Sequence, residues 1–292
     1  MYKLVAIDLD GTLLNSYSQV SEVNKQAIKR AIEKGSEIVL CSGRGFASVK
    51  SIANELGAEN YVICGNGSLI YNIKNEKIIY DNFIEKEKVL QIIQICEENS
   101  IYYSISTTQN IIAKSLNYNV LFYHQENEKK PEGQKTNINI VQDMYKYIKD
   151  RKEEDYLKIN ICDDHNVIFN GIIKKLRTIN KIDVLDVAHM SRKIIKYGTE
   201  EIEIGYYYTE ITNQNVNKWN AIQYLINELE ISKEEVIAIG DNINDKEMLE
   251  NAGLGIAMEN SAPYIKEMAD VIVSDNDNDG VAEAIEKYIL TE

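Results

Sequence analysis

Two carboxylates follow a short apolar segment near the beginning of the sequence. The run Leu4-Val5-Ala6-Ile7 ends at Asp8, and Asp10 comes two residues later, directly before a glycine. An apolar run of this length, bounded by polar residues, is typical of a strand buried on both faces of a parallel sheet. Ligands of such sheets bind at the carboxyl ends of the strands, where both acids would lie. Taken alone, the stretch is equally compatible with an acidic turn, because Asp and Gly are common turn residues.

Other apolar segments also end in polar residues. They are Glu37 to Cys41 before Ser42-Gly43-Arg44, Tyr61 to Cys64 before Gly65-Asn66-Gly67, and Val236 to Ile239 before Gly240-Asp241-Asn242-Ile243-Asn244-Asp245. Lys218 opens the segment that leads to the last of them. Carboxylates from separate strand ends, with one lysine and a hydroxyl, form a compact site for Mg²⁺ and phosphate, because Mg²⁺ prefers oxygen ligands and commonly keeps substrate phosphate in its shell. The combination makes the acidic turn a poor explanation for Asp8 and Asp10.

Helical segments between these strands indicate how the strand ends come together. The spacing of apolar residues predicts helices from Ser21 to Lys34, from Gly45 to Leu56 and from Lys218 onward, the first capped by Ser21. Strands and helices that alternate in this way predict an α/β fold, a doubly wound and mostly parallel Rossmann-like sheet. The pattern returns after Lys218 and ends with a strand at Gly255 to Met258, a helix capped by Ser261 and a strand at Val271 to Val273.

The middle of the chain has a different pattern and predicts an inserted α+β domain over residues 83–211, with the core formed by 1–82 and 212–292. Helices are expected at Glu85 to Asn99, Ile138 to Lys149 and Val167 to Thr178, and extended segments at Tyr102 to Thr107, Tyr156 to Cys162 and Lys193 to Thr212. Gln125 to Thr136, which contains Pro131-Glu132-Gly133, is expected to be an exposed loop. Tyr206-Tyr207-Tyr208 fits sheet packing better than the lining of a pocket.

Composition limits the partners. The 292 residues fit roughly two domains, and a formal charge of −14 argues against nucleic acid and against an anionic membrane as partners, since both require a basic face. The four cysteines form no CxxC pair and are expected to be buried free thiols. The sequence shows no leader segment and no apolar stretch long enough to cross a membrane, so a cytoplasmic protein is expected.

These motifs together resemble one family. The chain is similar to haloacid dehalogenase superfamily phosphatases of the Cof type, the branch (subfamily IIB) with a large cap inserted after the third strand. The motifs that carry the resemblance are Asp8-Leu9-Asp10-Gly11-Thr12, Ser42-Gly43-Arg44, Gly65-Asn66-Gly67, Lys218, Gly240 to Asp245 and Gly255 to Asn260. The resemblance covers the whole core, whereas the middle domain matches only in size, placement and α/β character.

The resemblance implies a Mg²⁺-dependent phosphatase that hydrolyses a small phosphorylated metabolite, such as a sugar phosphate or a phosphorylated cofactor. Asp8 is then the nucleophile that forms an aspartyl-phosphate, and Asp10 is the general acid and base. The remaining roles are metal binding by Asp8, Asp10 (through its carbonyl), Asp241 and Asp245, the last through water or Lys218, and phosphate binding by Ser42, Gly43, Arg44, Lys218 and Asn244.

Several alternatives stay open at this stage. The same scaffold fits a phosphomutase, and a non-enzymatic switch phosphorylated on Asp8 is a different class of function. Ser42 also fits a helix cap, Arg44 an ordinary surface residue, and Asn66 and Asn260 braces of their loops. In the family a glycine usually follows the phosphate-binding lysine, whereas this chain has Trp219, which puts the start of that helix in question. The cluster Asp163-Asp164-His165 fits a polar turn better than a metal site.

Overall fold

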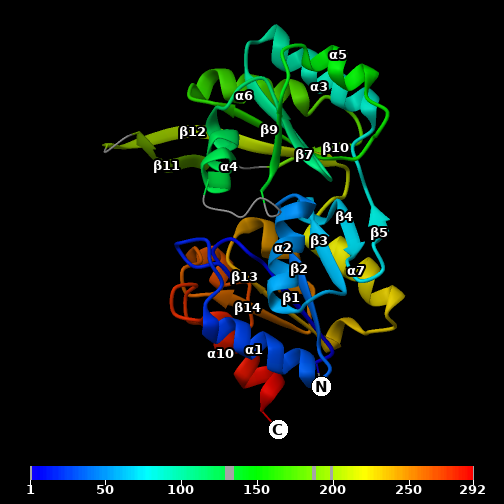
Figure 1. Ribbon diagram of the computed structural model, residues 1–292, viewed down its shortest axis with the longest axis vertical. Helices are drawn as coiled ribbons and strands as arrows, with labels where there is room; N and C mark the ends of the chain where they lie inside the picture. The colour runs from blue at the N-terminus through cyan, green and yellow to red at the C-terminus, as the bar shows by residue number, and fades with distance from the viewer. Residues whose placement is uncertain (1, 129–134, 186–188, 198–199, 292) are drawn as a thin grey trace. The chain divides into compact units, whose positions relative to one another are not determined.

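The computed structural model describes residues 2–128, 135–185, 189–197 and 200–291. The chain divides into two compact units, which we call the core unit (up to Asp81 and from Val216) and the inserted unit (Asn82–Asn215). The insertion expected from the sequence spans 83–211. Both units have the mixed sheets of an α/β protein (Figure 1).

The core unit is built on a sheet with the strand order β15-β14-β13-β1-β2-β3-β4-β5. Neighbouring strands from β15 to β3 are parallel, and β4 and β5 extend the sheet as an antiparallel hairpin. The strands are β1 (Leu4–Ile7), β2 (Glu37–Cys41), β3 (Tyr61–Cys64), β4 (Leu69–Asn72), β5 (Lys77–Asp81), β13 (Val236–Gly240), β14 (Leu254–Met258) and β15 (Val271–Val273). The predicted doubly wound, mostly parallel sheet is confirmed, and the hairpin β4–β5 is an addition that the sequence analysis missed.

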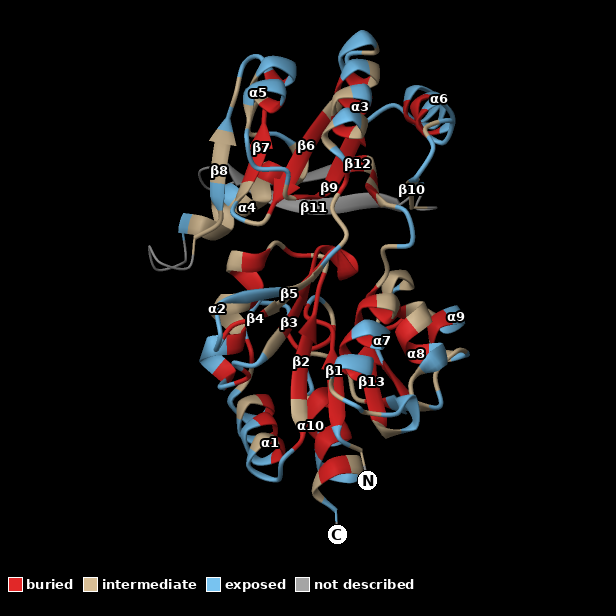
Figure 2. Ribbon diagram, turned by 90° about the vertical axis from the view of Figure 1, so that its right-hand side faces the viewer, coloured by how far each residue is buried: buried red, intermediate tan, exposed pale blue. Residues whose placement is uncertain are grey.

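Helices cover both faces of this sheet. They are α1 (Glu22–Glu33), α2 (Phe46–Leu56), α7 (Lys218–Glu228), α8 (Lys246–Asn251), α9 (Pro263–Lys266) and α10 (Gly280–Ile285). Leu4 and Ala6 pack against α7 and α8, while Val5 and Ile7, which alternate with them, are also fully buried. Burial on both faces explains the uninterrupted apolar run that the sequence shows. Figure 2 shows β1, β2 and β13 as buried along most of their length.

One predicted helix cap is confirmed, one was wrong, and the alternative that Ser42 is a helix cap is excluded. The Ser21 hydroxyl accepts a hydrogen bond from the Asn24 amide at 3.1 Å and caps α1 as predicted. The residue that caps α2 is Gly45, so Ser42 lies before the helix and is not its cap. Likewise α9 is capped by Ala262 and not by Ser261, because the helix begins with a proline, which fits the first helical position.

The inserted unit contains a second sheet, in the order β10-β12-β9-β6-β7-β8, with β11 paired to β12. Its strands are antiparallel except for the pair β7 and β8. The elements are α3 (Lys86–Glu98), β6 (Tyr102–Thr107), β7 (Asn110–Ala113), α4 (Tyr118–Glu128), β8 (Asn137–Ile140), α5 (Met144–Asp150), β9 (Tyr156–Asp163), α6 (Asn166–Leu176), β10 (Ile182–Val184), β11 (His189–Tyr197) and β12 (Glu200–Asn213).

The two faces of the inserted sheet differ in polarity. Side chains of α3, α5 and α6 pack on one face in an apolar cluster that includes Ile92, Ile148 and Phe169. The other face carries a buried Lys158 that pairs with Glu210 at 2.5 Å. A buried charge is tolerated only with a partner, so this face combines polar contacts with a second, smaller apolar cluster of Ile111, Ala113 and Val120.

The predictions for residues 125–149 were largely wrong. Asn137–Ile140 forms β8, and the predicted helix begins only at Met144, after an Asp143 side chain that accepts a hydrogen bond from the Lys146 amide at 2.9 Å. Gln125 to Glu128 is the end of α4, not part of a loop. Pro131-Glu132-Gly133 lies outside the described residues.

Other expectations for the chain are confirmed. Tyr206 is buried, with its ring 5.0 Å from that of Tyr118, which is the sheet packing favoured by the sequence. The four cysteines are free and buried. Within the described ranges, no helix is both long enough and apolar enough to span a bilayer.

Candidate active site

The predicted acids Asp8 and Asp241 follow neighbouring strands. In the parallel pair β1 and β13, Ile7 lies beside Ile239, and the Asp8 amide donates a hydrogen bond to the Ile239 carbonyl at 3.0 Å. Both strands therefore end at the same edge of the sheet in the core unit. Asp8 is only 4% exposed there. The sheet register therefore brings together residues more than 230 positions apart in the sequence.

Lys218 connects Asp8 to Asp245. Its Nζ donates to Asp8 Oδ1 and, at 2.5 Å, to Asp245 Oδ1, and the lysine is completely buried. Lys218 is the first residue of α7, whose start is capped by Asn217: the Asn217 side chain accepts a hydrogen bond from the Asn220 amide at 2.7 Å. Trp219 packs into the apolar core and is 7% exposed, so the bulky residue does not disturb the helix start.

Both oxygens of Asp245 are already engaged. Oδ1 accepts from Lys218, and Oδ2 accepts from the backbone amides of Asp241 and Asn242, each at 3.0 Å. A Cβ at Gly240 would lie 2.6 Å from the Asp245 side chain, so only glycine permits this approach. Asp245 therefore holds Lys218 and the loop after β13 in place.

Asp241 is held by the loop that follows β1. The Thr12 hydroxyl donates to Asp241 Oδ1 at 2.9 Å. Gly11 has a φ of +82°, and a Cβ there would lie 2.4 Å from Asp241 Oδ2. Thr12 was not among the predicted site residues, although its place in the motif that begins at Asp8 was the available signal.

The charges of this cluster are unbalanced. Asp8, Asp241 and Asp245 each offer a carboxylate oxygen within 4.8 Å of the others, whereas Lys218 supplies a single positive charge among them. Burial, with the charge of Asp245, raises the pKa of Asp8 well above its usual range and the pKa of Asp241 to about 6. Burial alone would lower the pKa of Lys218, but Asp245 and Asp8 outweigh it and raise that pKa. An oxygen-only set with excess negative charge fits a hard divalent cation such as Mg²⁺.

Asp10 has a different environment from Asp8. Its carboxylate forms a two-pronged ion pair with Arg44, with Nε to Oδ2 at 2.8 Å and Nη2 to Oδ1 at 2.6 Å. The Asp10 side chain is 59% exposed, and it is not one of the carboxylates that gather around Lys218. Arg44, predicted as a phosphate ligand, is thus engaged with the second acid of the motif.

The remaining predicted phosphate ligands lie after β2 (Ser42 and Gly43) and after β13 (Asn244). The buried Ser42 hydroxyl accepts a hydrogen bond from the Arg44 amide at 3.1 Å. A Cβ at Gly43 would lie 2.8 Å from Asn66 Oδ1, the same oxygen that accepts from Asn244 Nδ2 at 3.2 Å. Asn66 has a φ of +59° and joins the loops, as the sequence analysis favoured.

Comparisons with known proteins identify the family of the chain. The family model of haloacid dehalogenase-like hydrolases matches residues 5–285. The chain belongs to this family. The resemblance seen in the motifs is thereby confirmed, and the chain is a hydrolase whose relatives support the predicted class, a phosphoric monoester hydrolase.

Relatives match over almost the entire length. Phosphatase YwpJ of Bacillus subtilis is 28% identical, over 99% of this chain and 100% of that protein. The 5-amino-6-(5-phospho-D-ribitylamino)uracil phosphatase YcsE of the same organism is 25% identical, over 99% of this chain and 96% of the relative. A crystal structure of a haloacid dehalogenase-like hydrolase from Bacteroides thetaiotaomicron is 29% identical and aligns with a TM-score of 0.80, covering 98% of this chain and 99% of that one.

The loop after β1 of this haloacid dehalogenase-like hydrolase is braced from the far end of the sequence. Asn260 Nδ2 donates to the Gly11 carbonyl, and Asn276 Nδ2 donates to the Leu14 carbonyl, each at 2.8 Å. The prediction that Asn260 braces a turn is confirmed. These amide contacts fix the backbone of the loop that carries Asp10 and Thr12.

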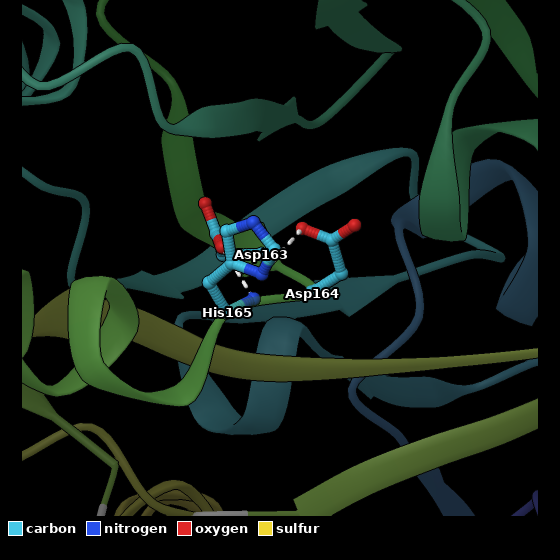
Figure 3. Close-up of side chains that lie close together, drawn as sticks. All are labelled: Asp163, Asp164 and His165. Carbon is cyan, nitrogen blue, oxygen red and sulfur yellow. Dashed lines mark hydrogen bonds and ion pairs between the residues drawn. The ribbon is translucent and has the colours of Figure 1, made fainter.

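Asp163-Asp164-His165 forms the polar turn that the sequence favoured. The His165 amide donates to Asp163 Oδ1 at 2.6 Å, and His165 Nδ1 lies 3.7 Å from Asp164 Oδ1 (Figure 3). His165 is the residue before α6, so the Asp163 contact closes the turn that starts this helix. The three side chains are consecutive and mostly solvent-exposed, and local turn geometry accounts for their proximity.

Proposed function

We propose that the chain is a Mg²⁺-dependent phosphatase that hydrolyses a small phosphorylated metabolite through an aspartyl-phosphate on Asp8. The observation that carries the proposal is the buried Asp8 carboxylate, paired with Lys218 and within 4.8 Å of the oxygens of Asp241 and Asp245. A carboxylate is a known covalent nucleophile, and the charge of Lys218 favours the ionised form of Asp8, which attacks without first losing a proton. The place of Asp8 beside a lysine and two further carboxylates suits a phosphate ester that arrives with a cation.

In the first half of the reaction an oxygen of Asp8 attacks phosphorus and the bond from phosphorus to the leaving oxygen breaks. Asp10 donates its proton to that oxygen, so the product leaves as an alcohol. In the second half a water oxygen attacks phosphorus, Asp10 takes the water proton, and the bond between Asp8 and phosphorus breaks. The sum is one ester and one water converted into one alcohol and inorganic phosphate.

Charge governs the binding of the substrate. A carboxylate and a phosphate repel each other by several kcal/mol at close range in a screened site. Lys218 lies against Asp8 and offsets part of that repulsion, and its third N–H is suited to a phosphoryl oxygen. We assign the Ser42 hydroxyl, the Gly43 amide and the Asn244 amide as the other donors to the phosphoryl group.

The same cluster is our proposed metal site. Asp241 and one oxygen of Asp8, with the backbone carbonyl of Asp10, would hold Mg²⁺, while Asp245 acts through Lys218 because both of its oxygens are engaged. When bound, the ion supplies positive charge next to the phosphoryl oxygens. The acid excess of the cluster and the raised pKa of Asp241 support the assignment.

The inserted unit is our candidate for substrate selection, as a cap. Its polar sheet face, with Lys158, Asn160 and Glu210, provides donors and acceptors that an apolar face would lack. A sugar phosphate or a phosphorylated cofactor is the class that fits, and the relative YcsE, named as a 5-amino-6-(5-phospho-D-ribitylamino)uracil phosphatase, supports it. The expected partner is a small molecule in the cytoplasm, not nucleic acid or membrane.

Replacement of the nucleophile tests the proposal. Asp8→Asn keeps the size of the side chain but replaces one carboxylate oxygen with an amide nitrogen, so Mg²⁺-dependent release of phosphate from an aryl phosphate ester should fall to background. The matched control is Asp163→Asn, the same chemical change at an acid of the inserted unit whose amide contact an asparagine oxygen can keep. The control should keep wild-type turnover.

Unchanged turnover in Asp8→Asn would overturn the proposal. The products of the wild-type reaction separate the alternatives. An isomerised sugar phosphate without inorganic phosphate indicates a phosphomutase, and a phosphorylated chain that accumulates without turnover indicates a phosphoacceptor switch.

A further inference from the structure

Arg44 holds Asp10 through both carboxylate oxygens. Two parallel N–H to O contacts, at 2.8 and 2.6 Å, match the fork of a guanidinium to the plane of a carboxylate. Such a pair fixes the orientation of the carboxylate as well as its position. Each oxygen of a carboxylate has a second lone-pair site, so Asp10 can carry the transferred proton there and face a substrate while it stays paired.

The guanidinium is the fixed member of this pair. The Arg44 side chain is 9% exposed, and its Nη1 donates to the Ser48 hydroxyl at 3.2 Å, at the start of α2. Its backbone is held as well, because the amide donates to Ser42 Oγ at 3.1 Å and the carbonyl accepts from the Gly65 amide at 3.0 Å. Arg44 is thus anchored to the ends of β2 and β3 and to a helix.

Asp10 is the member that depends on its partner. Its side chain is 59% exposed and projects from the loop after β1, where the backbone, not the side chain, is braced by Asn260 at Gly11 and by Asn276 at Leu14. An exposed carboxylate on a loop samples several rotamers unless another group holds it. Arg44 supplies such a hold from an independently anchored position.

We infer that Arg44 is the positioning residue of Asp10: it orients the carboxylate that moves protons in the reaction and is not primarily a ligand of the phosphoryl group. The inference rests on the proposed function, because it requires Asp10 to act on the leaving oxygen. Misplacement of a reacting group by about 1 Å can lower a rate by roughly 10²-fold. Loss of Arg44 should therefore weaken the same step that loss of Asp10 weakens.

The leaving group of the substrate distinguishes the two roles. An alkyl phosphate releases an alkoxide that needs a proton, whereas a nitrophenyl phosphate releases a stable anion that does not. A positioning residue for the proton donor matters mainly for the alkyl ester. A residue that binds the phosphoryl group matters equally for both esters, since the two substrates share that group.

The experiment measures kcat and KM for glycerol phosphate and for p-nitrophenyl phosphate with saturating Mg²⁺. The variants are Arg44→Gln, Arg44→Lys, Asp10→Asn and the double variant Asp10→Asn/Arg44→Gln, each checked for its thermal melting. Arg44→Gln should lower kcat for glycerol phosphate by roughly 10²-fold and for p-nitrophenyl phosphate by less than about fivefold. In the Asp10→Asn background the same change should cost less than about threefold.

Arg44→Lys separates the roles a second time. Lysine binds phosphate well as a point charge but cannot form the two-pronged pair. The inference therefore expects Arg44→Lys to resemble Arg44→Gln with glycerol phosphate. It also covers the case in which Arg44→Gln does not fold, because Arg44→Lys retains the charge beside Asp10.

Two results would overturn the inference. One is an equal loss with both esters, expressed in KM, that persists in the Asp10→Asn background. The other is full rescue by lysine. Both outcomes leave the proposed function standing. Failure of the proposed function looks different, because Asp10→Asn itself would then spare the alkyl ester.

Discussion

Each unit of the molecule has a buried lysine that pairs with acidic side chains. The two lysines differ in how many acids surround them. In the inserted unit, Lys158 pairs with Glu210 at 2.5 Å, and Asn160 Nδ2 donates to the same carboxylate oxygen at 3.2 Å. One positive charge meets one negative charge there. In the core unit, Lys218 pairs with Asp8 and Asp245, and Asp241 lies within 4.8 Å of both acids.

The lysine pair of the inserted unit is balanced in charge, whereas the cluster of the core unit has an excess of negative charge. Burial alone would lower the pKa of Lys158, but Glu210 outweighs it and raises that pKa, so the pair is stable as it stands. In the core unit the acids outnumber the lysine, and the pKa values of Asp8 and Asp241 rise because repulsion by Asp245 adds to the effect of burial. Buried acids in excess are the expected signature of a cation site, and a balanced pair is not.

The largest expected effect on stability comes from breaking the balanced pair. Lys158→Met leaves the Glu210 side chain, which is only 16% exposed, without its ammonium partner, which should lower the free energy of unfolding of the inserted unit by about 3–5 kcal/mol. The double variant Lys158→Met/Glu210→Gln removes both charges and should recover more than half of the loss. Urea denaturation of the single and double variants measures both values.

A single variant as stable as the wild-type protein would show that Glu210 reaches water or protonates at little cost. The Lys158–Glu210 pair would then no longer be an example of a buried pair that depends on its charge balance. Equal losses in the single and double variants would mean that packing of the lysine stem, and not charge, stabilises the pair.

Removal of an acid from the core cluster should instead raise the stability of the metal-free protein. Asp241→Asn can keep the hydrogen bond from Thr12 because an amide oxygen also accepts, and it removes one of the excess negative charges. In metal-free buffer with a chelator, this variant should be more stable than the wild-type protein by roughly 1 kcal/mol. With Mg²⁺ present the order should reverse, since the variant has lost a proposed metal ligand.

Thermal melting with and without Mg²⁺ measures this reversal. The matched control is Asp277→Asn, which changes an exposed acid that accepts from Ser16 and lies outside the carboxylate cluster. Its response to Mg²⁺ should equal that of the wild-type protein. A destabilised metal-free Asp241→Asn would indicate that the cluster needs this carboxylate even without a cation.

The smallest expected effect is the dependence of the Mg²⁺ response on pH. The folded-state pKa of Asp241 is raised to about 6 from an ordinary value of 3.8, so between these values the folded protein binds more protons than the unfolded chain. The contribution of this group to metal-free stability therefore falls as pH rises through that window. Mg²⁺ needs the ionised carboxylate, so its stabilising effect should grow over the same range.

Melting temperatures at pH 5 and at pH 7, each with Mg²⁺ and with a chelator, test the sign. The difference between the two buffers should be larger at pH 7. An equal difference at both values would place the cation on groups that do not titrate in this range.

Much of the core site could be predicted because its residues sit at strand ends. The run Leu4 to Ile7 stops at Asp8, and the run that begins at Val236 stops just before Asp241, so the pattern of apolar residues marks both positions without knowledge of the fold. The parallel register of β1 and β13 then brings the two acids together. Lys218 could be placed as well, since it opens a helix with clear apolar spacing.

The inserted unit was harder to predict because its elements depend on partners distant in sequence. Asn137-Ile138-Asn139-Ile140 alternates with a period of two, which was an available signal for β8, but the following helix made the whole stretch resemble one helix. In the core unit the hairpin β4–β5 was also missed, because Leu69–Asn72 is a short strand that follows a turn with positive φ at Asn66.

Side-chain partners were beyond the sequence pattern. The motif that contains Arg44 indicates phosphate chemistry, but the pairing of Arg44 with Asp10 depends on rotamers and on the distance between two loops. The Lys158–Glu210 pair likewise needs the antiparallel register that places Glu210 beside Asn160, two residues along the strand from Lys158. Such contacts follow from tertiary geometry and not from local propensity.

The covalent step on Asp8 is the most direct test of the account. Wild-type protein is mixed with substrate and Mg²⁺, quenched in acid during turnover and reduced with borohydride, which converts an aspartyl-phosphate into homoserine, and the peptide that contains residue 8 is examined by mass spectrometry. The account predicts homoserine at position 8 only in samples quenched with substrate and Mg²⁺ present, and none in Asp8→Asn. Continued turnover with an unmodified Asp8, or with the label on another residue, would contradict it.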